Sequence, residues 1–309
     1  MEKILITGSK SRAASRLSEF FLQNKHSHDF ILLEPNRLLF DITNRDAVNT
    51  YLIKNKPDWI IHFAAITDVK LCEKVRGSTK SLVWRTNVVG VENLIESCKK
   101  FHIKLIYPST SMVFPGLQEF PGPYNEVDMP EKNLSLLSWY GATKAVAENN
   151  IRASEIEYCI LRFSSTTRAK FIERKQDFFW KIMQNLLNGT KTSYFSDQYI
   201  SLTDHAELAE VIRQIICLRK TEQTLHLSSP NITTPFEVAR YLATKTGFSI
   251  DSAHASTLSS YALDHSEQEV RRFFPKYSGL QSQSSQETLG LRFKTWEKIV
   301  EAFVHENNL

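Results

Sequence analysis

The stretch Lys3–Ala14, KILITGSKSRAA, decides the fold, because a short apolar run leads directly into a glycine turn and a helical pattern. Ile4–Ile6 are three successive apolar residues, as in a strand that is buried on both faces of a parallel sheet. Gly8 marks a tight turn, and apolar residues then recur at helical spacing from about Arg12 to Asn24. This order of strand, turn and helix is typical of the first unit of a doubly wound α/β fold.

The same alternation continues through the first half of the chain. It predicts an α/β protein with a Rossmann-type, doubly wound parallel sheet. After residue 165 the alternation is less regular, so we expect residues 1–165 to form the main domain. Residues 166–309 are expected to hold the remaining strands and a small C-terminal lobe, with a soft, discontinuous boundary. The Ser- and Gln-rich segment Gln281–Gln286 is expected to be a surface loop. Strands are expected at 30–33, 59–63, 104–107 and 158–162, with short ones near 194 and 225, and helices at 44–54, 83–99, 140–151, 178–187, 206–218, 235–246 and 295–307.

Composition narrows the class of protein. The chain has 309 residues, 42% of them apolar, which is enough to bury a substantial core. A net charge of only +4 without a dense basic stripe argues against nucleic acid and membrane surfaces as partners. We expect no secretory leader and no membrane span, and scattered structural thiols rather than disulfides or a metal site. These features favour a cytoplasmic protein. The four cysteines are Cys72, Cys98, Cys159 and Cys217.

The glycine turn is the first candidate ligand site. A dinucleotide needs bare backbone near its pyrophosphate at a helix N-terminus, and Gly8 with the following Ser9 meets that need. The later glycines of the usual three-residue spacing are replaced by the small residues Ser11 and Ala14. Two nearby basic residues, Lys10 and Arg12, would add positive charge beside a phosphate. Taken alone, the turn fits an ordinary strand-to-helix connection equally well.

Residues after the next strands extend this candidate site. Glu34 ends the second strand, where an acid accepts hydrogen bonds from ribose hydroxyls and repels a 2′-phosphate; a solvated surface acid is the alternative. Asp41 and Ile42 follow a short loop, where they would meet the adenine edge. The small residues Ala64 and Ala65 end the third strand and allow a cofactor to pass closely. We assign no chemical role to the neighbouring His62 and predict no metal site.

The strongest chemical signal is the heptapeptide Ser138–Lys144, SWYGATK. Tyr140 and Lys144 stand four residues apart and therefore share one face of a helix. A nearby ammonium is expected to lower the pKa of the tyrosine, which then exchanges a proton with a carbonyl or alcohol oxygen. Thr110, directly after the fourth strand, lies where ligands bind in such sheets. Tyr–Lys pairs are common, and the added threonine makes a catalytic triad the favoured interpretation.

With these residues in place, the chain resembles extended short-chain dehydrogenases/reductases, and among them most closely the dTDP-4-dehydrorhamnose reductases. The resemblance runs from Lys3 to about Leu218 and more faintly to the C-terminus. Its motifs occur in the family's order, with four departures. The glycine turn keeps one of the family's three glycines, and Ser111 stands where the family has Asp. The segment 131–139 before the tyrosine is longer and more apolar than in the family, and Leu202 replaces a Pro. The matching pieces are ITG (6–8), FDIT (40–43), HFAA (62–65), TDV (67–69), NVVGVENL (87–94), ST (109–110), VF (113–114), YNE (124–126), YG (140–141), LR (161–162) and DQ (197–198).

The resemblance implies roles for the matching residues. Thr110, Tyr140 and Lys144 match the catalytic triad, in which Tyr140 protonates a keto oxygen while a nicotinamide delivers hydride. The implied reaction is NAD(P)H-dependent reduction of a keto group on a nucleotide-linked sugar, with Glu34 favouring NADH. The implied organisation is a cofactor-binding domain with a substrate-binding lobe, in a possible homodimer. The residues expected to line the cofactor are Gly8, Ser9, Lys10, Ser11, Arg12, Glu34, Asp41, Ile42, Ala64, Ala65 and Asn87.

Two alternatives stay open. A non-catalytic NAD(P)-binding regulatory subunit of the same fold would explain the reduced glycine turn. A nucleotide-sugar epimerase would use the same triad, although Val113–Phe114 is closer to the reductases. A dehydratase is disfavoured, because Ser111–Met112 follows the threonine where those enzymes carry Asp-Glu.

Overall fold

A six-stranded sheet with the strand order β2-β1-β3-β4-β5-β9 organises the molecule. The pairings of β1 with β2, β1 with β3 and β3 with β4 are all parallel. Strand β1 lies between β2 and β3, so the chain reverses its direction of winding there. This is a topological switch point, the place where α/β sheets bind ligands. The strands are β1 (Glu2–Thr7), β2 (Phe30–Leu33), β3 (Trp59–His62), β4 (Lys104–Thr110), β5 (Tyr158–Phe163) and β9 (Gln223–Leu227).

The computed structural model describes residues 1–23, 30–167 and 177–309. They divide into two units, each assembled from three segments. Unit 1 comprises Met1–Val113, Met129–Arg162 and Ala209–Leu225. Unit 2 comprises Phe114–Asp128, Phe163–Leu208 and His226–Leu309.

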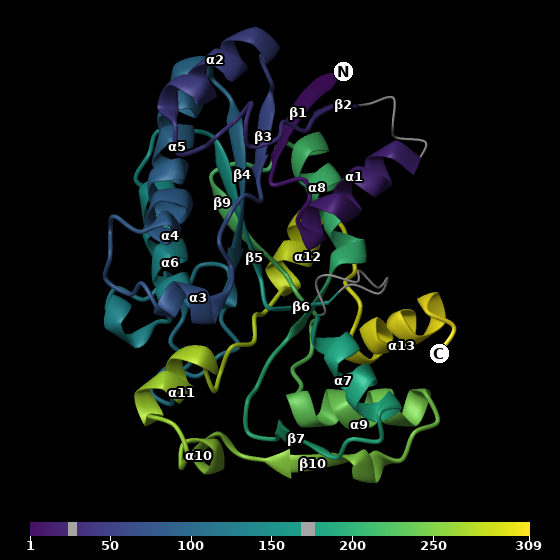
Figure 1. Cartoon of the computed structure of the whole chain (residues 1–309). Helices are drawn as coiled ribbons and strands as arrows, with labels where there is room; N and C mark the ends of the chain where they lie inside the picture. Colours follow the sequence, from purple (N-terminus) through teal and green to yellow (C-terminus); the bar gives the residue numbers. More distant parts are fainter. Residues whose placement is uncertain (24–29, 168–176) are drawn as a thin grey trace. The chain divides into compact units, whose positions relative to one another are not determined.

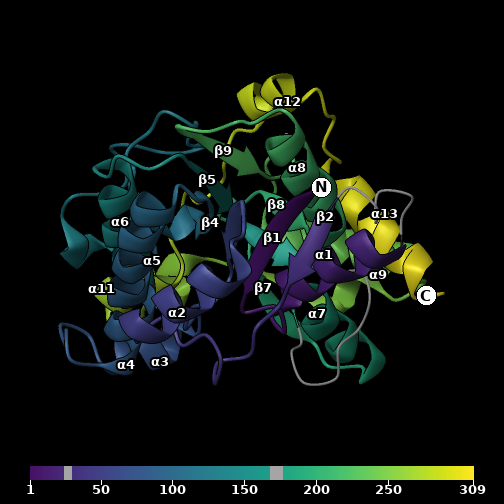
Figure 2. The same cartoon turned by 90° about the horizontal axis from the view of Figure 1, so that it is seen from above.

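Helices cover both faces of the sheet in unit 1 (Figures 1 and 2). Helices α2, α5 and α6 lie on one face, and α1 lies on the other together with α8. This is the doubly wound architecture that the sequence predicts. The helices are α1 (Arg12–Gln23), α2 (Arg45–Asn55), α3 (Val69–Glu73), α4 (Leu82–Trp84), α5 (Gly90–Phe101), α6 (Trp139–Arg152) and α8 (His205–Cys217), with a π-helical segment (Arg85–Val89) joining α4 to α5.

Side-chain caps explain where several of these helices begin. Asn44 accepts hydrogen bonds from the amides of Asp46 and Ala47 at the start of α2. Ser138 accepts one from the amide of Gly141 at the start of α6. Each cap satisfies an amide that the first helical turn leaves unpaired. The predicted helices at 44–54 and 140–151 are confirmed within two residues at each end.

The face of the sheet under α2, α5 and α6 carries a continuous apolar core. Buried strand residues pack against helix residues that recur at helical spacing, such as Val91, Leu94 and Cys98 on α5. Burying this area supplies the main stabilisation of the unit, at roughly 25 cal/mol per Å² of apolar surface. The core therefore provides a rigid support for the strand ends.

Unit 2 holds two small parallel pairs of strands, β6 (Ser165–Thr167) with β8 (Leu202–Asp204) and β7 (Thr192–Phe195) with β10 (Ala253–Ser256). Its core packs Phe179, Val238 and Phe303 from three different helices. Among the helices that the described residues form in either unit, none is long and apolar enough to cross a membrane. The remaining helices are α7 (Phe178–Leu187), α9 (Pro235–Lys245), α10 (Leu258–Tyr261), α11 (Glu267–Phe273), α12 (Gln283–Leu289) and α13 (Trp296–Glu306).

The expected loop at Gln281–Gln286 is wrong, because most of it belongs to helix α12. Ser285 is fully buried; its hydroxyl donates to Glu126 at 2.6 Å and accepts from the amide of His226 at 2.7 Å. The Gln286 side chain accepts from the amide of Phe293 at 2.9 Å. Polar side chains that find partners within the fold can be buried, and their composition alone does not show this.

Candidate active site

A cavity of about 580 Å³ lies at the switch point of the sheet in unit 1. The segments after β1, β2 and β3 line it together. Because the ends of three parallel strands converge here, residues far apart in the sequence face one ligand-sized space. The predicted cofactor residues that line the cavity are Gly8, Ser9, Lys10, Glu34, Asp41, Ile42, Ala64 and Ala65.

The backbone of the glycine turn requires glycine at position 8 and accommodates side chains at positions 11 and 14. Gly8 has a φ of +65°, and a Cβ atom there would lie 2.7 Å from the amide nitrogen of Ala64. Ser11 instead uses its side chain, which accepts a hydrogen bond from the amide of Ala14 at 3.2 Å and so caps α1. Ala14 is fully buried. Arg12 begins α1, and its side chain lies outside the described part of the chain.

The acidic residues of the cavity are already engaged by neighbours. The carboxylate of Glu34 accepts a hydrogen bond from the Ser18 hydroxyl at 2.5 Å. The Asp41 carboxylate accepts from the Thr43 amide and from Arg37 Nε at 2.9 and 3.2 Å. Although partial burial alone would raise the pKa of Asp41, these hydrogen bonds hold it below its usual value. Arg37 is a cavity residue that the sequence analysis missed, although its place just after an acid-ended second strand is a usable signal.

The three predicted catalytic residues meet where β4 ends. Thr110 is the last residue of β4, and Tyr140 and Lys144 lie one turn apart on α6. The Thr110 hydroxyl lies beside the Tyr140 phenol and lowers its pKa. The ammonium of Lys144 donates to the carbonyl of Pro108 at 2.6 Å and lies 3.8 Å from the ring centre of Tyr107. The geometry therefore brings this predicted set together.

The expected lowering of the tyrosine pKa is wrong for the free protein. Burial raises the pKa of Tyr140, the neighbouring Cys72 raises it further, and only the Thr110 hydroxyl lowers it. Burial lowers the pKa of Lys144 to about 7, although the charge of Glu148 acts in the opposite direction. Desolvation is the larger effect for both groups, since Lys144 is buried and Tyr140 is half-buried. Tyr140 is thus a protonated phenol at neutral pH, as a proton donor must be.

A second glycine, missed as a site determinant, sets the position of α6. A Cβ atom on Gly141 would overlap the carbonyl oxygen of Met112. The absence of a side chain lets the first turn of α6 lie directly against the short 3₁₀ turn at Ser111–Val113. This close approach carries Tyr140 to Thr110.

Asn87 acts behind the cavity rather than on its wall. Its side chain is 1% exposed; its amide donates to the Ile66 carbonyl at 2.9 Å and accepts from the Ile66 amide at 2.8 Å. It also donates to the Thr143 hydroxyl at 3.1 Å. Asn87 lies in the π-helical segment, a conformation that recurs at functional sites. It ties the loop after β3 to the residue beside Lys144.

His62 supports the same loop. Its Nδ1 lies 2.8 Å from the hydroxyl of Thr7, which also accepts a hydrogen bond from the amide of Ala64. Burial lowers the pKa of His62 to about 3, with a smaller contribution from Lys144, so the ring is neutral. In residues 1–23, 30–167 and 177–309 no cluster of three or more His, Cys, Asp or Glu side chains has the arrangement of a metal site.

Comparison with known proteins decides the family. The family model described as "RmlD substrate binding domain" matches residues 1–309. The chain belongs to the RmlD substrate binding domain family. It is 29% identical over 215 residues to a dTDP-4-dehydrorhamnose reductase of Aggregatibacter actinomycetemcomitans, covering 70% of this chain and 67% of that one.

Two solved structures support this assignment. A dTDP-4-dehydrorhamnose reductase of Bacillus anthracis, solved in complex with NADP, superimposes with a TM-score of 0.82 at 25% identity and 99% coverage of both chains. A dTDP-4-dehydrorhamnose reductase of Clostridium acetobutylicum gives a TM-score of 0.81 at 25% identity, covering 99% of this chain and 100% of that one. Family membership and these likenesses confirm the predicted Rossmann-type fold and the resemblance to the dTDP-4-dehydrorhamnose reductases. The expected preference for NADH finds no support, since the Bacillus anthracis structure holds NADP.

Proposed function

We propose that this protein reduces the keto group of a nucleotide-linked sugar of the dTDP-4-dehydrorhamnose type. The observation that carries the proposal is the meeting of Thr110, Tyr140 and Lys144 at the end of β4. The substrate class follows from the names of the relatives in the same family. The cavity at the switch point suits a dinucleotide, because the Gly8 backbone, which carries no side chain, lies in its wall next to Ala64. A pyrophosphate can approach such a bare backbone closely.

The residues of the chain divide the work of this reaction. A bound reduced nicotinamide supplies the hydride that the carbonyl carbon receives. Tyr140 gives its phenolic proton to the carbonyl oxygen, and the neighbouring Thr110 hydroxyl, which lowers the pKa of Tyr140, assists that transfer. The ammonium of Lys144 stabilises the phenolate that Tyr140 becomes, until solvent returns the proton. Each step uses a group that unit 1 already holds in position.

We further propose that NADPH is a cofactor at least as good as NADH. Glu34 and Arg37 both line the cavity beyond β2, the region that meets the adenosine ribose in this kind of fold. An acid there disfavours a 2′-phosphate, whereas an arginine accommodates one. The pair therefore does not impose the NADH preference that Glu34 alone suggests. The expected homodimer stays a prediction.

The test is a coupled assay with dTDP-4-dehydrorhamnose and each reduced cofactor, run on the wild type and on Tyr140→Phe. Loss of turnover by about 100-fold or more in Tyr140→Phe, with unchanged cofactor affinity, is the result expected for a general acid. Equal turnover in the two proteins would remove the role given to Tyr140.

The same assay separates the two alternatives. An epimerase would convert a nucleotide sugar without net consumption of cofactor. A non-catalytic regulatory subunit would bind cofactor and turn over no keto sugar. In the reduced glycine turn Ser11 caps α1 and Ala14 packs in the core, so α1 forms without the two later glycines, which supports the reductase over that second alternative.

A further inference from the structure

Three successive residues at the end of β4, Pro108–Thr110, each lie beside a different residue of α6. Lys144 donates to the carbonyl of the first at 2.6 Å. Glu148 accepts from the hydroxyl of the second at 2.5 Å, and Tyr140 lies beside the hydroxyl of the third, which lowers its pKa. Residues 140, 144 and 148 are spaced by four and share one helix face, so they form a ladder along the strand end.

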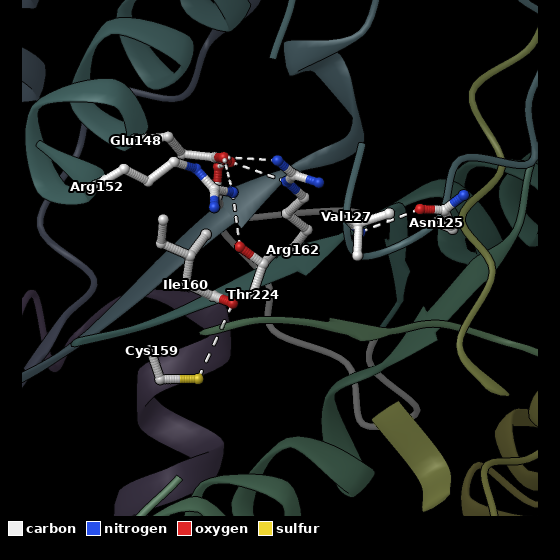
Figure 3. Close-up of polar contacts among 9 residues, drawn as sticks. Asn125, Val127, Glu148, Arg152, Cys159, Ile160, Arg162 and Thr224 are labelled. Carbon is white, nitrogen blue, oxygen red and sulfur yellow. Dashed lines mark hydrogen bonds and ion pairs between the residues drawn. The ribbon is translucent and has the colours of Figure 1, made fainter. Parts of the chain in front are cut away.

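Glu148 is the best anchored member of this ladder and lies outside the proposed triad. Its side chain is 0% exposed and lies between two guanidinium groups (Figure 3). Arg162, also 0% exposed, donates through Nε at 3.1 Å and through a terminal nitrogen at 2.8 Å. Arg152 donates at 3.3 Å and is itself held by Thr224 at 2.6 Å. A carboxylate fixed on two sides cannot change its orientation easily.

Glu148 also influences the charge of Lys144. Lys144 lies over the ring of Tyr107 and interacts with the His62 ring and the Glu148 carboxylate, and Tyr140 lies one turn away on α6. His62 is neutral, since its pKa lies near 3, and burial raises the pKa of both phenols. Glu148 is ionised, because Arg162, Ser109 and Arg152 hold its pKa below the usual value despite burial. Its negative charge favours the ammonium form of Lys144 against the cost of burial.

We propose that Glu148, anchored by Arg162, is a positioning residue that holds Ser109 and Thr110 in register with Tyr140 and supplies the counter-charge for the buried Lys144. The proposal rests on the proposed reductase function. It separates two contributions of one side chain, which are reach toward Ser109 and negative charge near Lys144.

Three variants of the full-length protein separate these contributions. Glu148→Gln keeps the reach and loses the charge, so the alkaline limb of kcat/KM moves to lower pH by about one unit. Glu148→Asp keeps the charge and shortens the reach, so the limb stays in place and kcat/KM falls about tenfold. Ser109→Ala is the matched control, because it removes one hydrogen bond without a change in charge. Like Glu148→Asp, it is expected to lower kcat/KM and to leave the alkaline limb in place.

A readout besides activity covers the case in which the wild type does not reduce the proposed substrate. Protein labelled with [13Cε]lysine is titrated by NMR, and the Lys144 signal is the one missing in Lys144→Met. Glu148→Gln lowers the titration midpoint of that signal, whereas Ser109→Ala leaves it unchanged. An inactive wild type with this shift overturns the reductase function and keeps the electrostatic role of Glu148.

Two outcomes overturn the positioning role. One is a folded Glu148→Gln protein, judged by its melting temperature, in which neither the alkaline limb nor the Lys144 signal moves. The other is a Ser109→Ala protein with the kcat/KM of the wild type. If Glu148→Gln does not fold because Arg162 is left unpaired, Glu148→Asp and Ser109→Ala still decide the reach, and the double variant Glu148→Gln/Arg162→Gln, which leaves no buried guanidinium without its partner, tests the charge. Loss of the Glu148 carboxylate lowers the midpoint of the Lys144 signal in that double variant, and an unchanged midpoint contradicts the charge role.

Discussion

Unit 1 holds the cavity at the switch point (the proposed cofactor crevice) and the end of α6 that carries Tyr140, Lys144 and Glu148 (the proposed catalytic end). The two regions are built on different principles. In the crevice, Gly8 provides close backbone approach, and the charged side chain of Arg37 remains largely exposed. At the catalytic end, Lys144 and Glu148 are buried and bonded to the last residues of β4. The first region depends on where the backbone lies, and the second depends on which side chains are present.

This difference explains which parts of the family pattern the chain can lose. Two glycines of the cofactor turn are replaced by Ser11 and Ala14, and the helix begins normally because Ser11 caps it. In the proposed mechanism no such exchange is open to Tyr140 or Lys144, because their functional groups carry out the proton transfer. The predictions below test how far this division holds.

The largest effect is expected from Gly141→Ala. The added methyl group meets the Met112 carbonyl, a backbone atom that cannot move aside, so α6 must shift away from the end of β4. We expect destabilisation by roughly 3 kcal/mol and loss of nearly all turnover. Thermal melting and the reductase assay measure both.

The matched control is Gly90→Ala, the same change in helix α5. Its methyl group would meet the end of the Ile42 side chain, which can turn away. A small effect on melting is expected there. Equal losses in the two variants would contradict the idea that backbone contact at α6 is the special constraint.

Replacing Lys144 by Met is expected to change stability in a pH-dependent way. The folded pKa of about 7 lies below the ordinary value of 10.5, so between them the unfolded chain holds a proton that the folded protein has released. Wild-type stability attributable to this group therefore rises with pH across that window. Relative to the wild type, Lys144→Met should be most stable near pH 6 and lose on the order of 2 kcal/mol of this advantage by pH 9.

Urea unfolding of both proteins at several pH values measures this difference, and the variant should be inactive throughout. A stability difference that does not vary with pH would mean that Lys144 keeps an ordinary pKa in the fold. The catalytic end would then cost no stability, contrary to its description as a region of buried charge.

A smaller effect is expected from changes in the glycine turn. Gly8→Ala should weaken NADPH binding by at least about tenfold, because a Cβ at positive φ forces the loop away from Ala64. Ser11→Gly, which restores a family glycine, should change affinity by less than about twofold and cost only a few tenths of a kcal/mol in capping. Nicotinamide fluorescence titration measures both. A clear gain in NADPH affinity for Ser11→Gly would show that the lost glycine contributes to cofactor binding, contrary to this prediction.

The sequence predicts the fold and the placement of the proposed catalytic residues because both follow from local patterns. The apolar run Ile4–Ile6 with Gly8 marks the first strand and turn, and the spacing of Tyr140 and Lys144 places them on one helix face. Thr110 is placed at the carboxyl end of the fourth strand by the apolar run before it, and it is the last residue of β4. Each of these inferences needs only neighbouring residues and the rules of parallel sheets.

What the sequence did not predict depends on burial and on distant partners. The direction of the Tyr140 pKa was wrong, because desolvation outweighs the helix neighbour that the spacing shows. Helix α12 was taken for a loop, because the partner that satisfies Ser285 is Glu126, far away in the chain. Asn87 was expected on the wall of the cavity but acts behind it through Ile66. Such contacts arise only once the chain has folded.

The smallest effect is expected for Arg37→Gln, and it tests the crevice side of the comparison. Arg37 is 67% exposed and paired with Asp41, so solvent screens any contact with a 2′-phosphate. NADPH affinity should fall about threefold at low salt and less at high salt, whereas NADH affinity should not change. Lys10→Gln is the control, since Lys10 lines the same cavity from the turn after β1. If Arg37→Gln weakens both cofactors equally, the arginine supports the loop through Asp41 and reads no phosphate. Cofactor binding near Arg37 would then depend on the position of the loop backbone, as it does near Gly8.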